Sequence, residues 1–332
     1  MKKKRIASLL LLAPLTLLAA CSSQQAIVLE ANWFSNTSTK NIPDGFEETL
    51  VYDVSFQKSV SAEQGRFTIN YPNGGTYTTK FTSGTTDDKQ KTYIYTTTLT
   101  MEVEYILDGV SSGLRKDTVT TYVEFLDTAH ELRPLSSWRE VHGSAPRMAP
   151  GSPGATLKDC YAEFEYKVET SYNYDKDKAT VTLTNIGKEA ADDDKLSNTV
   201  KLDGKGMYFD NEQLIPVLRA ADLSSSMTLR TIDPSTRSLE KIAIKDGPKS
   251  ISLTQSVKRK TDEKAEEETF KAIEIGISYD KQNSGGTQKF TIAKRDSRDN
   301  NKWRNVCLKY EYPVIYSHGT MTYRLISADF YG

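Results

Sequence analysis

The sequence is poor in the residues that most often carry metal and redox chemistry. Its 332 residues include only three cysteines and three histidines, and no histidine has a second one three or four positions away; the three are His130, His142 and His318. No Cys-x-x-Cys pair is present. These absences argue against a zinc hydrolase of the His-Glu-x-x-His type and against a dithiol redox enzyme. We therefore expect neither a metal nor another cofactor.

The chain also lacks an excess of positive charge. It contains 43 Lys and Arg against 44 Asp and Glu, and four of the basic residues lie within the opening MKKKR. A nucleic-acid-binding domain needs a basic surface for phosphates, and a polybasic membrane-binding surface needs one for anionic lipids. The composition therefore predicts no nucleic-acid partner and no adsorption to membranes through charge.

The apolar run at the N-terminus is short and follows a cluster of positive charge. Met1–Arg5 precedes Ile6–Ala20, which has no charged residue and is rich in Leu and Ala. This order is typical of an export signal. The run contains Pro14 and is shorter than the roughly 20 residues that a membrane-spanning helix needs. We therefore interpret it as a signal peptide.

The run ends in Leu18-Ala19-Ala20-Cys21, which resembles the bacterial lipobox. The resemblance implies that a peptidase recognises Leu18, Ala19 and Ala20 and cuts before Cys21. It also implies that the Cys21 sulfur carries a diacylglyceryl group, with fatty acids such as palmitate. The alternative is an ordinary signal peptide with a cysteine here by chance. Two or three acyl chains anchor a protein to a membrane almost permanently, at about 0.8 kcal/mol per buried methylene.

These features predict a lipid-anchored, extracytoplasmic protein on the cell membrane or the outer membrane of a bacterium. Residues 1–20 form the lipoprotein signal peptide, and residues 21–45, rich in Ser, Thr, Asn and Gln, form a flexible tether. We expect residues 46–332 to form a single large domain. The Gly- and Pro-containing segment 143–156 is expected to be a loop inside it.

Two cysteines, Cys160 and Cys307, remain after Cys21. In an exported protein an even number of cysteines is compatible with a disulfide. Closing so long a loop would stabilise the fold by up to about 5 kcal/mol. Two buried free thiols fit the composition equally well, so both alternatives stay open.

Alternation of apolar and polar residues dominates the remaining chain. The longest example is TYIYTTTLTMEVEYIL, residues 92–107, in which the odd positions are mostly apolar. A period of two over this length predicts one long strand with a single buried face. PNGG, residues 72–75, separates two further alternating runs and predicts a hairpin between them. We expect a dozen or more strands in a mostly antiparallel sheet.

Helical patterns are scarce. Phe209–Leu223 is the strongest, because Asp210 and Gln213 have the spacing of a capping box. A second short helix is predicted at Pro134–Val141. So few helices are unable to cover so many strands, and the sheet must therefore curl on itself. The fold class we predict is mainly β: an antiparallel sheet curled into an incomplete, half barrel, with one or two helices covering its mouth.

Three segments occur in an order and spacing that resemble a known family; they are FEETLVYDVSF (46–56), DNEQLIPVLRAADL with MTLRTID (210–233), and KYEYPVIYSHGTMTYRLISADF (309–330). They are similar to a family of bacterial exported proteins without an established activity. Its fold is akin to the lipoprotein carriers and receptors of the Lol system, an incomplete barrel closed by helices. The resemblance implies a tendency to bind lipid-like or other apolar molecules, and no catalytic residues.

A sheet that curls incompletely leaves a concave apolar cavity, the usual form of a ligand site. We expect a non-enzymatic protein that binds or carries an apolar or lipid-like ligand there. The expected lining residues are Leu50, Tyr52, Val54, Phe56, Leu99, Met101, Val103, Tyr105, Leu214 and Leu218. The alternatives are a structural or interaction lipoprotein of the cell envelope with a filled core, for which the sequence names no protein partner, and a hydrolase of cell-wall polymers with two carboxylates in a cleft.

Overall fold

The computed structural model describes residue 29 and residues 45–59, 65–128, 131–147, 151–187, 195–202, 207–223, 227–234, 237–280, 287–294, 303, 305–314 and 318–330. The predicted signal peptide, the peptidase residues Leu18, Ala19 and Ala20, the acylation site Cys21 and almost all of the predicted tether lie outside these residues. Within them, no helix is both long enough and apolar enough to cross a membrane.

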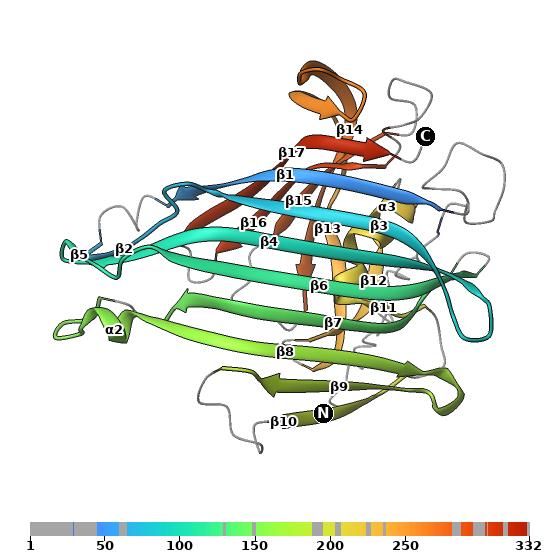
Figure 1. Ribbon diagram of the computed structural model, residues 1–332, viewed down its shortest axis with the longest axis horizontal. Coiled ribbons are helices and arrows are strands. Elements are labelled where there is room, and N and C mark those ends of the chain that lie inside the picture. The colour runs from blue at the N-terminus through green and yellow to red at the C-terminus, as the bar shows by residue number, and fades with distance from the viewer. Residues whose placement is uncertain are drawn as a thin grey trace, which may run out of the picture.

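The described residues form seventeen strands of one sheet (Figure 1). The first part contains β1 (Glu47–Lys58), β2 (Phe67–Asn70), β3 (Gly75–Thr85), β4 (Lys91–Leu107), β5 (Val110–Ser111), β6 (Arg115–Thr128), β7 (Glu131–Pro146), β8 (Tyr161–Asn173), β9 (Lys178–Asn185) and β10 (Lys195–Lys201). The second part contains β11 (Phe209–Asp210), β12 (Thr228–Asp233), β13 (Ser238–Arg259), β14 (Glu266–Tyr279), β15 (Gln288–Ala293), β16 (Cys307–Val314) and β17 (Gly319–Phe330). The prediction of a mainly β, mostly antiparallel protein is confirmed.

Helical turns are few and short. They are α2 (Leu157–Cys160), the 3₁₀ turns η1 (Tyr174–Lys176) and η2 (Asn211–Gln213), and α3 (Leu214–Ala220). The predicted capping box is present, with Asp210 as the N-cap of η2 and Gln213 as its partner. Pro216 lies in the first turn of α3, where its missing N–H costs no hydrogen bond. The helix is buried between the strands and does not lie across an open mouth.

The long alternating run is one strand, β4, as predicted. Tyr93, Tyr95, Val103 and Tyr105 on its odd face are buried, whereas the side chains between them are mostly intermediate. The strand pairs with β3 and β6 along most of its length. The alternation along β4 therefore indicates a sheet with one face buried in the core.

The strands close into a ring, which corrects the prediction of a half barrel. β13 pairs with β14, β14 with β15, β15 with β16 and β16 with β17, all antiparallel. β17 then pairs in parallel with β13, where Lys258 meets Ser327 and Arg259 meets Ala328. The ring closes over a short stretch only. β16 pairs with one edge of β17 as far as Arg324, and β13 pairs with the same edge at Ser327 and Ala328.

The other strands extend the sheet from this ring. β1 pairs with β17 and with β3, and the sheet continues through β4, β6, β7, β8 and β9 to β10. On the opposite side β12 pairs with β13, and β11 with β12. The two sides approach each other, because the Asn198 side chain of β10 donates a hydrogen bond to the Arg237 carbonyl beside β13 (2.6 Å). The curled sheet thereby surrounds α3.

Three local predictions are wrong. Residues 134–141 belong to strand β7, because β6 and β8 hydrogen-bond to both of its edges and tertiary pairing overrides local propensity. The predicted loop 143–156 begins later for the same reason, since β7 continues to Pro146. The PNGG segment does form a turn, with Gly74 N donating to Tyr71 O (3.1 Å), but β2 pairs with β4 and not with β3.

The PNGG turn requires glycine at its third position. Gly74 has φ of +61°, which other residues adopt at a cost. A Cβ atom there would lie 2.4 Å from the Val54 carbonyl oxygen. The turn therefore redirects the chain from β2 past β1 and into β3.

Candidate functional site

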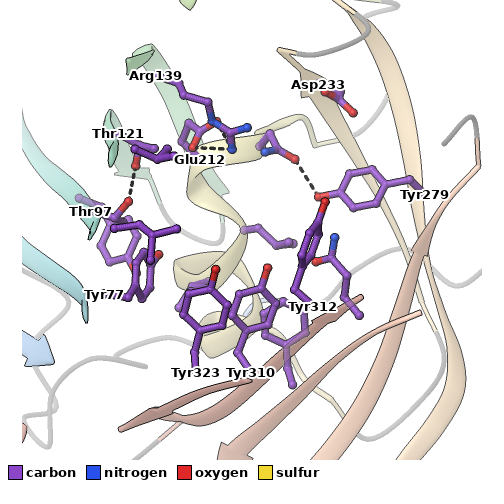
Figure 2. A pocket seen from close by; sticks show the side chains of 18 residues that line it. Tyr77, Thr97, Thr121, Arg139, Glu212, Asp233, Tyr279, Tyr310, Tyr312 and Tyr323 are labelled. Atoms are coloured by element: carbon purple, nitrogen blue, oxygen red, sulfur yellow. Dashed lines mark hydrogen bonds and ion pairs between the residues drawn. The ribbon is translucent and has the colours of Figure 1, made fainter. Parts of the chain in front are cut away.

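A cavity of about 270 Å³ lies inside the curled sheet, beside the N-terminal end of α3 (Figure 2). It is lined by Tyr77, Tyr95, Thr97, Leu99, Val119, Thr121, Arg139, Asn211, Glu212, Leu214, Ile215, Asp233, Tyr279, Gln288, Phe290, Tyr310, Tyr312 and Tyr323. They come from the early strands β3, β4, β6 and β7, from η2 and α3, and from the late strands β12 and β14–β17. Both sides of the sheet thus contribute to one site.

Aromatic rings from three neighbouring strands form one wall of the cavity. Phe290 on β15 lies opposite Tyr310 on β16, which lies opposite Tyr323 on β17. The rings of Phe290 and Tyr310 stack at 4.7 Å and 16°, and those of Tyr310 and Tyr323 stack at 4.7 Å and 28°. Tyr77 meets Tyr323 edge to face at 5.3 Å. Cross-strand register therefore creates a row of rings, which we call the tyrosine row (Phe290, Tyr310 and Tyr323).

The tyrosine row presents hydroxyl groups to the cavity. Figure 2 shows Tyr310 and Tyr323 side by side, with both hydroxyls directed toward the centre of the site. Burial raises the pKa of both phenols, so they stay neutral at physiological pH. The Tyr279 hydroxyl at the other side of the cavity donates to Asn211 Oδ1 (2.8 Å).

An ion pair lies on the wall facing the tyrosine row. Arg139 Nη2 on β7 lies 2.9 Å from Glu212 Oε1 and 3.1 Å from Oε2. The side chain of Glu212 is 5% exposed and that of Arg139 is 26% exposed. Burial lowers the pKa of Arg139, but the Glu212 carboxylate more than offsets this, so the guanidinium stays charged. The pair is a fixed polar group with both a donor and an acceptor side.

Asp210 fixes the turn that carries Glu212. Its carboxylate accepts hydrogen bonds from Ser137 Oγ (2.6 Å), Tyr172 Oη (2.7 Å) and the Glu212 backbone N–H (2.9 Å). The hydroxyls of β7 and β8 thereby hold the N-terminus of η2 against the wall. Burial, together with the nearby Glu212 charge, raises the pKa of Asp210 to about 6.

A second buried pair holds the other end of α3. Arg219 Nη1 and Nη2 donate to the two carboxylate oxygens of Glu48 on β1, at 2.5 and 3.0 Å. Asn305 Nδ2 donates to the Arg219 carbonyl (2.6 Å). The helix therefore spans the interior between two walls, and this places Leu214 and Ile215 at the cavity.

Two of the ten predicted lining residues, Leu99 and Leu214, line this cavity. Leu50, Tyr52 and Val54 are buried in a packed cluster of β1 and β13–β17, and Phe56 and Met101 pack against that cluster. Val103 and Tyr105 belong to a cluster with β2, and Leu218 belongs to the cluster around α3. Most of the predicted residues fill the core, since alternation identifies the inner face but not its hollow part.

The two remaining cysteines are free thiols, which excludes the disulfide alternative in this structure. Both are buried, and they belong to different clusters: Cys160 packs with Phe67 and Tyr105, and Cys307 packs with the core around α3. Burial raises the pKa of Cys307 to about 12, so this thiol is unreactive.

Several polar residues at the cavity were missed from the sequence. Arg139 and Glu212 belong to different elements, and no local motif joins them. The tyrosines carried a signal, because those of β16 and β17 alternate with polar residues, but strand pairing was needed to bring them together.

One short motif of the sequence resembles a catalytic motif but does not have its geometry in this fold. Gly109-Val110-Ser111-Ser112-Gly113 has the spacing of a nucleophile elbow, Gly-x-Ser-x-Gly. It forms the tip between β4 and β6, not a turn from a strand into a helix. Ser111 Oγ donates to Glu104 Oε1 (2.5 Å). Among the described residues no group of three or more His, Cys, Asp and Glu side chains is arranged to hold a metal ion.

No protein-family model matches the sequence, and no curated protein matches it. Among solved structures, the chain is similar to the crystal structure of a β-barrel-like protein of a domain of unknown function, DUF1849, from Brucella abortus. The two share 12% sequence identity with a TM-score of 0.43, over 86% of this chain and 98% of that chain. A TM-score below 0.5 assigns no function, so the site's own geometry has to carry the functional proposal.

Proposed function

We propose that this protein is a lipid-anchored, extracytoplasmic binding protein that holds a small amphipathic molecule in the cavity and does not act as an enzyme. The observation that carries the proposal is a hollow inside the curled sheet. Leu99, Val119, Leu214 and Ile215 supply its apolar surface, and the tyrosine row with the Arg139–Glu212 pair supplies its polar surface.

The size of the cavity limits the ligand. Its volume of about 270 Å³ lies at the lower end of small-molecule sites, which run from roughly 300 to 1,000 Å³. A ligand of this size has a few rings or one short chain, so a whole two-chain lipid does not fit. A lipid is therefore held by one part only, with its remainder outside the cavity.

Binding is tested with the mature chain, residues 21–332, carrying Cys21→Ser so that it stays unacylated. We expect native mass spectrometry to detect a copurifying small molecule, and the cavity to bind an uncharged apolar fluorescent probe such as N-phenyl-1-naphthylamine. Val119→Trp fills the cavity and should abolish probe binding. The control is Val110→Trp at a hairpin tip, where the valine is 62% exposed. Equal binding by the two variants would favour a structural lipoprotein with a filled core.

Anchoring is tested separately in bacteria fed labelled palmitate. We expect the label to follow the protein into the membrane fraction and to disappear in Cys21→Ala. The matched control is Cys160→Ser, because Cys160 is a buried thiol of the domain and has no part in the lipobox. Retention of label in Cys21→Ala would refute the lipoprotein assignment without affecting the ligand site.

A further inference from the structure

Building on the proposed binding function, we infer that the group bound beside the tyrosine row is an uncharged, polyhydroxylated ring, that is, a saccharide unit. It is either a free sugar or the headgroup of a glycolipid. Hydrocarbon, ammonium and anionic groups fit this side of the cavity less well. The inference rests on which surfaces the aromatic rings expose, and on which polar atoms the protein leaves without partners.

Tyr310, at the centre of the tyrosine row, exposes its edge and hydroxyl, because neighbouring rings cover both of its faces. Tyr310 on β16 is flanked by Phe290 on β15 and Tyr323 on β17, and both stack on it at 4.7 Å. Tyr323 also meets Tyr77 edge to face, with the ring centroids 5.3 Å apart. An aromatic cage for a quaternary ammonium group needs open ring faces. The tyrosine row offers hydrogen-bonding groups in their place.

The hydroxyls of Tyr310, Tyr312 and Tyr323 are available to a ligand. None of the three makes a hydrogen bond to any residue that the structure describes, although all three line the cavity. A phenol hydroxyl donates one hydrogen bond and accepts others. Three such groups on adjacent strands match a ligand that carries several hydroxyls, whereas a hydrocarbon would leave all three desolvated and unpaired.

The facing wall adds a polar group of another kind. Arg139 and Glu212 both line the cavity, and Arg139 Nη2 lies 2.9 Å from Glu212 Oε1 and 3.1 Å from Oε2. The pair combines N–H donors with carboxylate acceptors in one place. A polyol can donate and accept hydrogen bonds from one ring, so it suits a wall of this kind.

The charge of the lining disfavours an anion. One guanidinium, Arg139, and two carboxylates, Glu212 and Asp233, are among the lining residues, so positive charge is not in excess. Arg139 is already held by Glu212. A phosphate or sulfate would have to displace that carboxylate, whereas a neutral saccharide leaves the pair intact.

The test uses the unacylated mature chain and six octyl-chain or methyl probes below their aggregation concentrations. Octyl glucoside, octyl trimethylammonium and octyl sulfate share one tail and differ in headgroup; methyl glycosides of glucose, galactose and N-acetylglucosamine lack the tail. We expect isothermal titration calorimetry to show at least tenfold tighter binding of a glycoside than of the ammonium or the sulfate. Equal affinity for methyl and octyl glycosides would indicate a free sugar, and tighter binding of octyl glucoside would indicate a glycolipid headgroup.

The hydroxyls are tested by Tyr310→Phe, Tyr312→Phe and Tyr323→Phe, which keep the rings and remove one oxygen each. Each substitution should weaken glycoside binding roughly two- to tenfold, the range for one hydrogen bond. The matched control is Tyr122→Phe, which removes a hydroxyl that donates to Glu124 (3.3 Å) outside the cavity. It should bind as the unsubstituted chain does.

Two failures are distinguishable. If N-phenyl-1-naphthylamine and all the other probes fail to bind, the binding function is refuted and the saccharide inference is refuted with it. If the fluorescent probe binds but the glycosides do not, or if the ammonium or sulfate probe binds more tightly, the saccharide inference alone is overturned. Unchanged glycoside affinity in all three tyrosine variants would also overturn it, since the sugar would then lie elsewhere.

Discussion

The strands β14–β17 are packed solid at one end and enclose a cavity at the other. At the end where β13 meets β17, the interior is filled by Trp303, Phe270 and Leu308. At the opposite end the same strands contribute Tyr279, Phe290 and the cross-strand pair of Tyr310 and Tyr323 to the cavity. An alternating pattern is common to both ends, so the pattern alone does not decide whether a curled sheet is filled or hollow.

The difference lies in what enters the interior. Residue Trp303, which precedes β16, is fully buried and meets Phe270 and Phe330 edge to face at 5.1 and 5.3 Å. This large side chain thereby fills one end of the ring. At the other end α3 lies in the interior instead, and its polar anchors at Asp210 and Arg219 hold it against two walls. The space between the helix and the tyrosine row remains open.

The largest expected effect comes from emptying the filled end. Trp303→Ala should lower the free energy of unfolding by about 4 kcal/mol, because it leaves a large cavity among packed side chains. Urea unfolding followed by circular dichroism measures it. Trp303→Phe is the matched control and should cost clearly less, since it keeps a ring and removes an indole N–H that has no partner among the described residues. If the two variants lose similar amounts of unfolding free energy, packing of the aromatic ring is not what stabilises this end of the sheet.

Next in size is the anchor at the C-terminal end of α3. Glu48→Gln should cost about 3 kcal/mol of unfolding free energy, because Arg219 would stay charged and buried without its counter-ion. The two side chains are 4% and 3% exposed. Glu47→Gln is the control, since its pair with Lys80 is about half exposed and worth little. Equal stability of the two variants would show that α3 is held by apolar packing alone.

Asp210, the anchor at the other end, should make stability depend on pH. Its pKa of about 6 in the folded state exceeds the value of about 3.9 in the unfolded chain. The folded state therefore binds the proton more tightly, and this contribution to stability is present below about pH 4 and is lost as the pH rises through 6. Asn keeps the N-cap but does not titrate. From pH 4 to pH 7 the unfolding free energy of the native chain should therefore fall by roughly 2–3 kcal/mol relative to that of Asp210→Asn.

Asp175→Asn is measured in parallel, because Asp175 is exposed in η1, and it gives the effect of an aspartate-to-asparagine change at an exposed position. If the two variants depend on pH alike, the raised pKa of Asp210 is contradicted, and with it the view that this carboxylate is desolvated by the fold.

Local pattern was sufficient for most of the strands and insufficient for their pairing. The alternation of residues 92–107 identified β4, and the spacing of Asp210 and Gln213 identified the start of the helical segment, since both signals lie within a few residues. The contact between Arg259 and Ala328 that closes the ring joins positions far apart in the chain, and no local signal reports it. Trp138 and its neighbours were assigned to a helix because nothing in that segment shows that two other strands flank it.

The same limit applies to the cavity. Leu99 and Leu214 were predicted because they lie on apolar faces, and both line it. Arg139 and Glu212 are ordinary charged residues in the sequence, and only the fold places a β7 side chain opposite the turn before α3. A search for apolar faces therefore finds the packed end of the sheet more readily than the hollow end.

The smallest expected effect completes the comparison of the two ends. Tyr310→Phe should change the free energy of unfolding by less than about 1 kcal/mol, because the ring still stacks between Phe290 and Tyr323 and the lost hydroxyl has no partner within the described chain. Thermal unfolding without added ligand measures this, with Tyr52→Phe as the contrasting variant. Tyr52 Oη donates to the Cys307 carbonyl (2.8 Å) in the packed interior, so its loss should cost more. If Tyr310→Phe costs as much as Tyr52→Phe, the tyrosine row is a structural element rather than a surface kept free for a ligand.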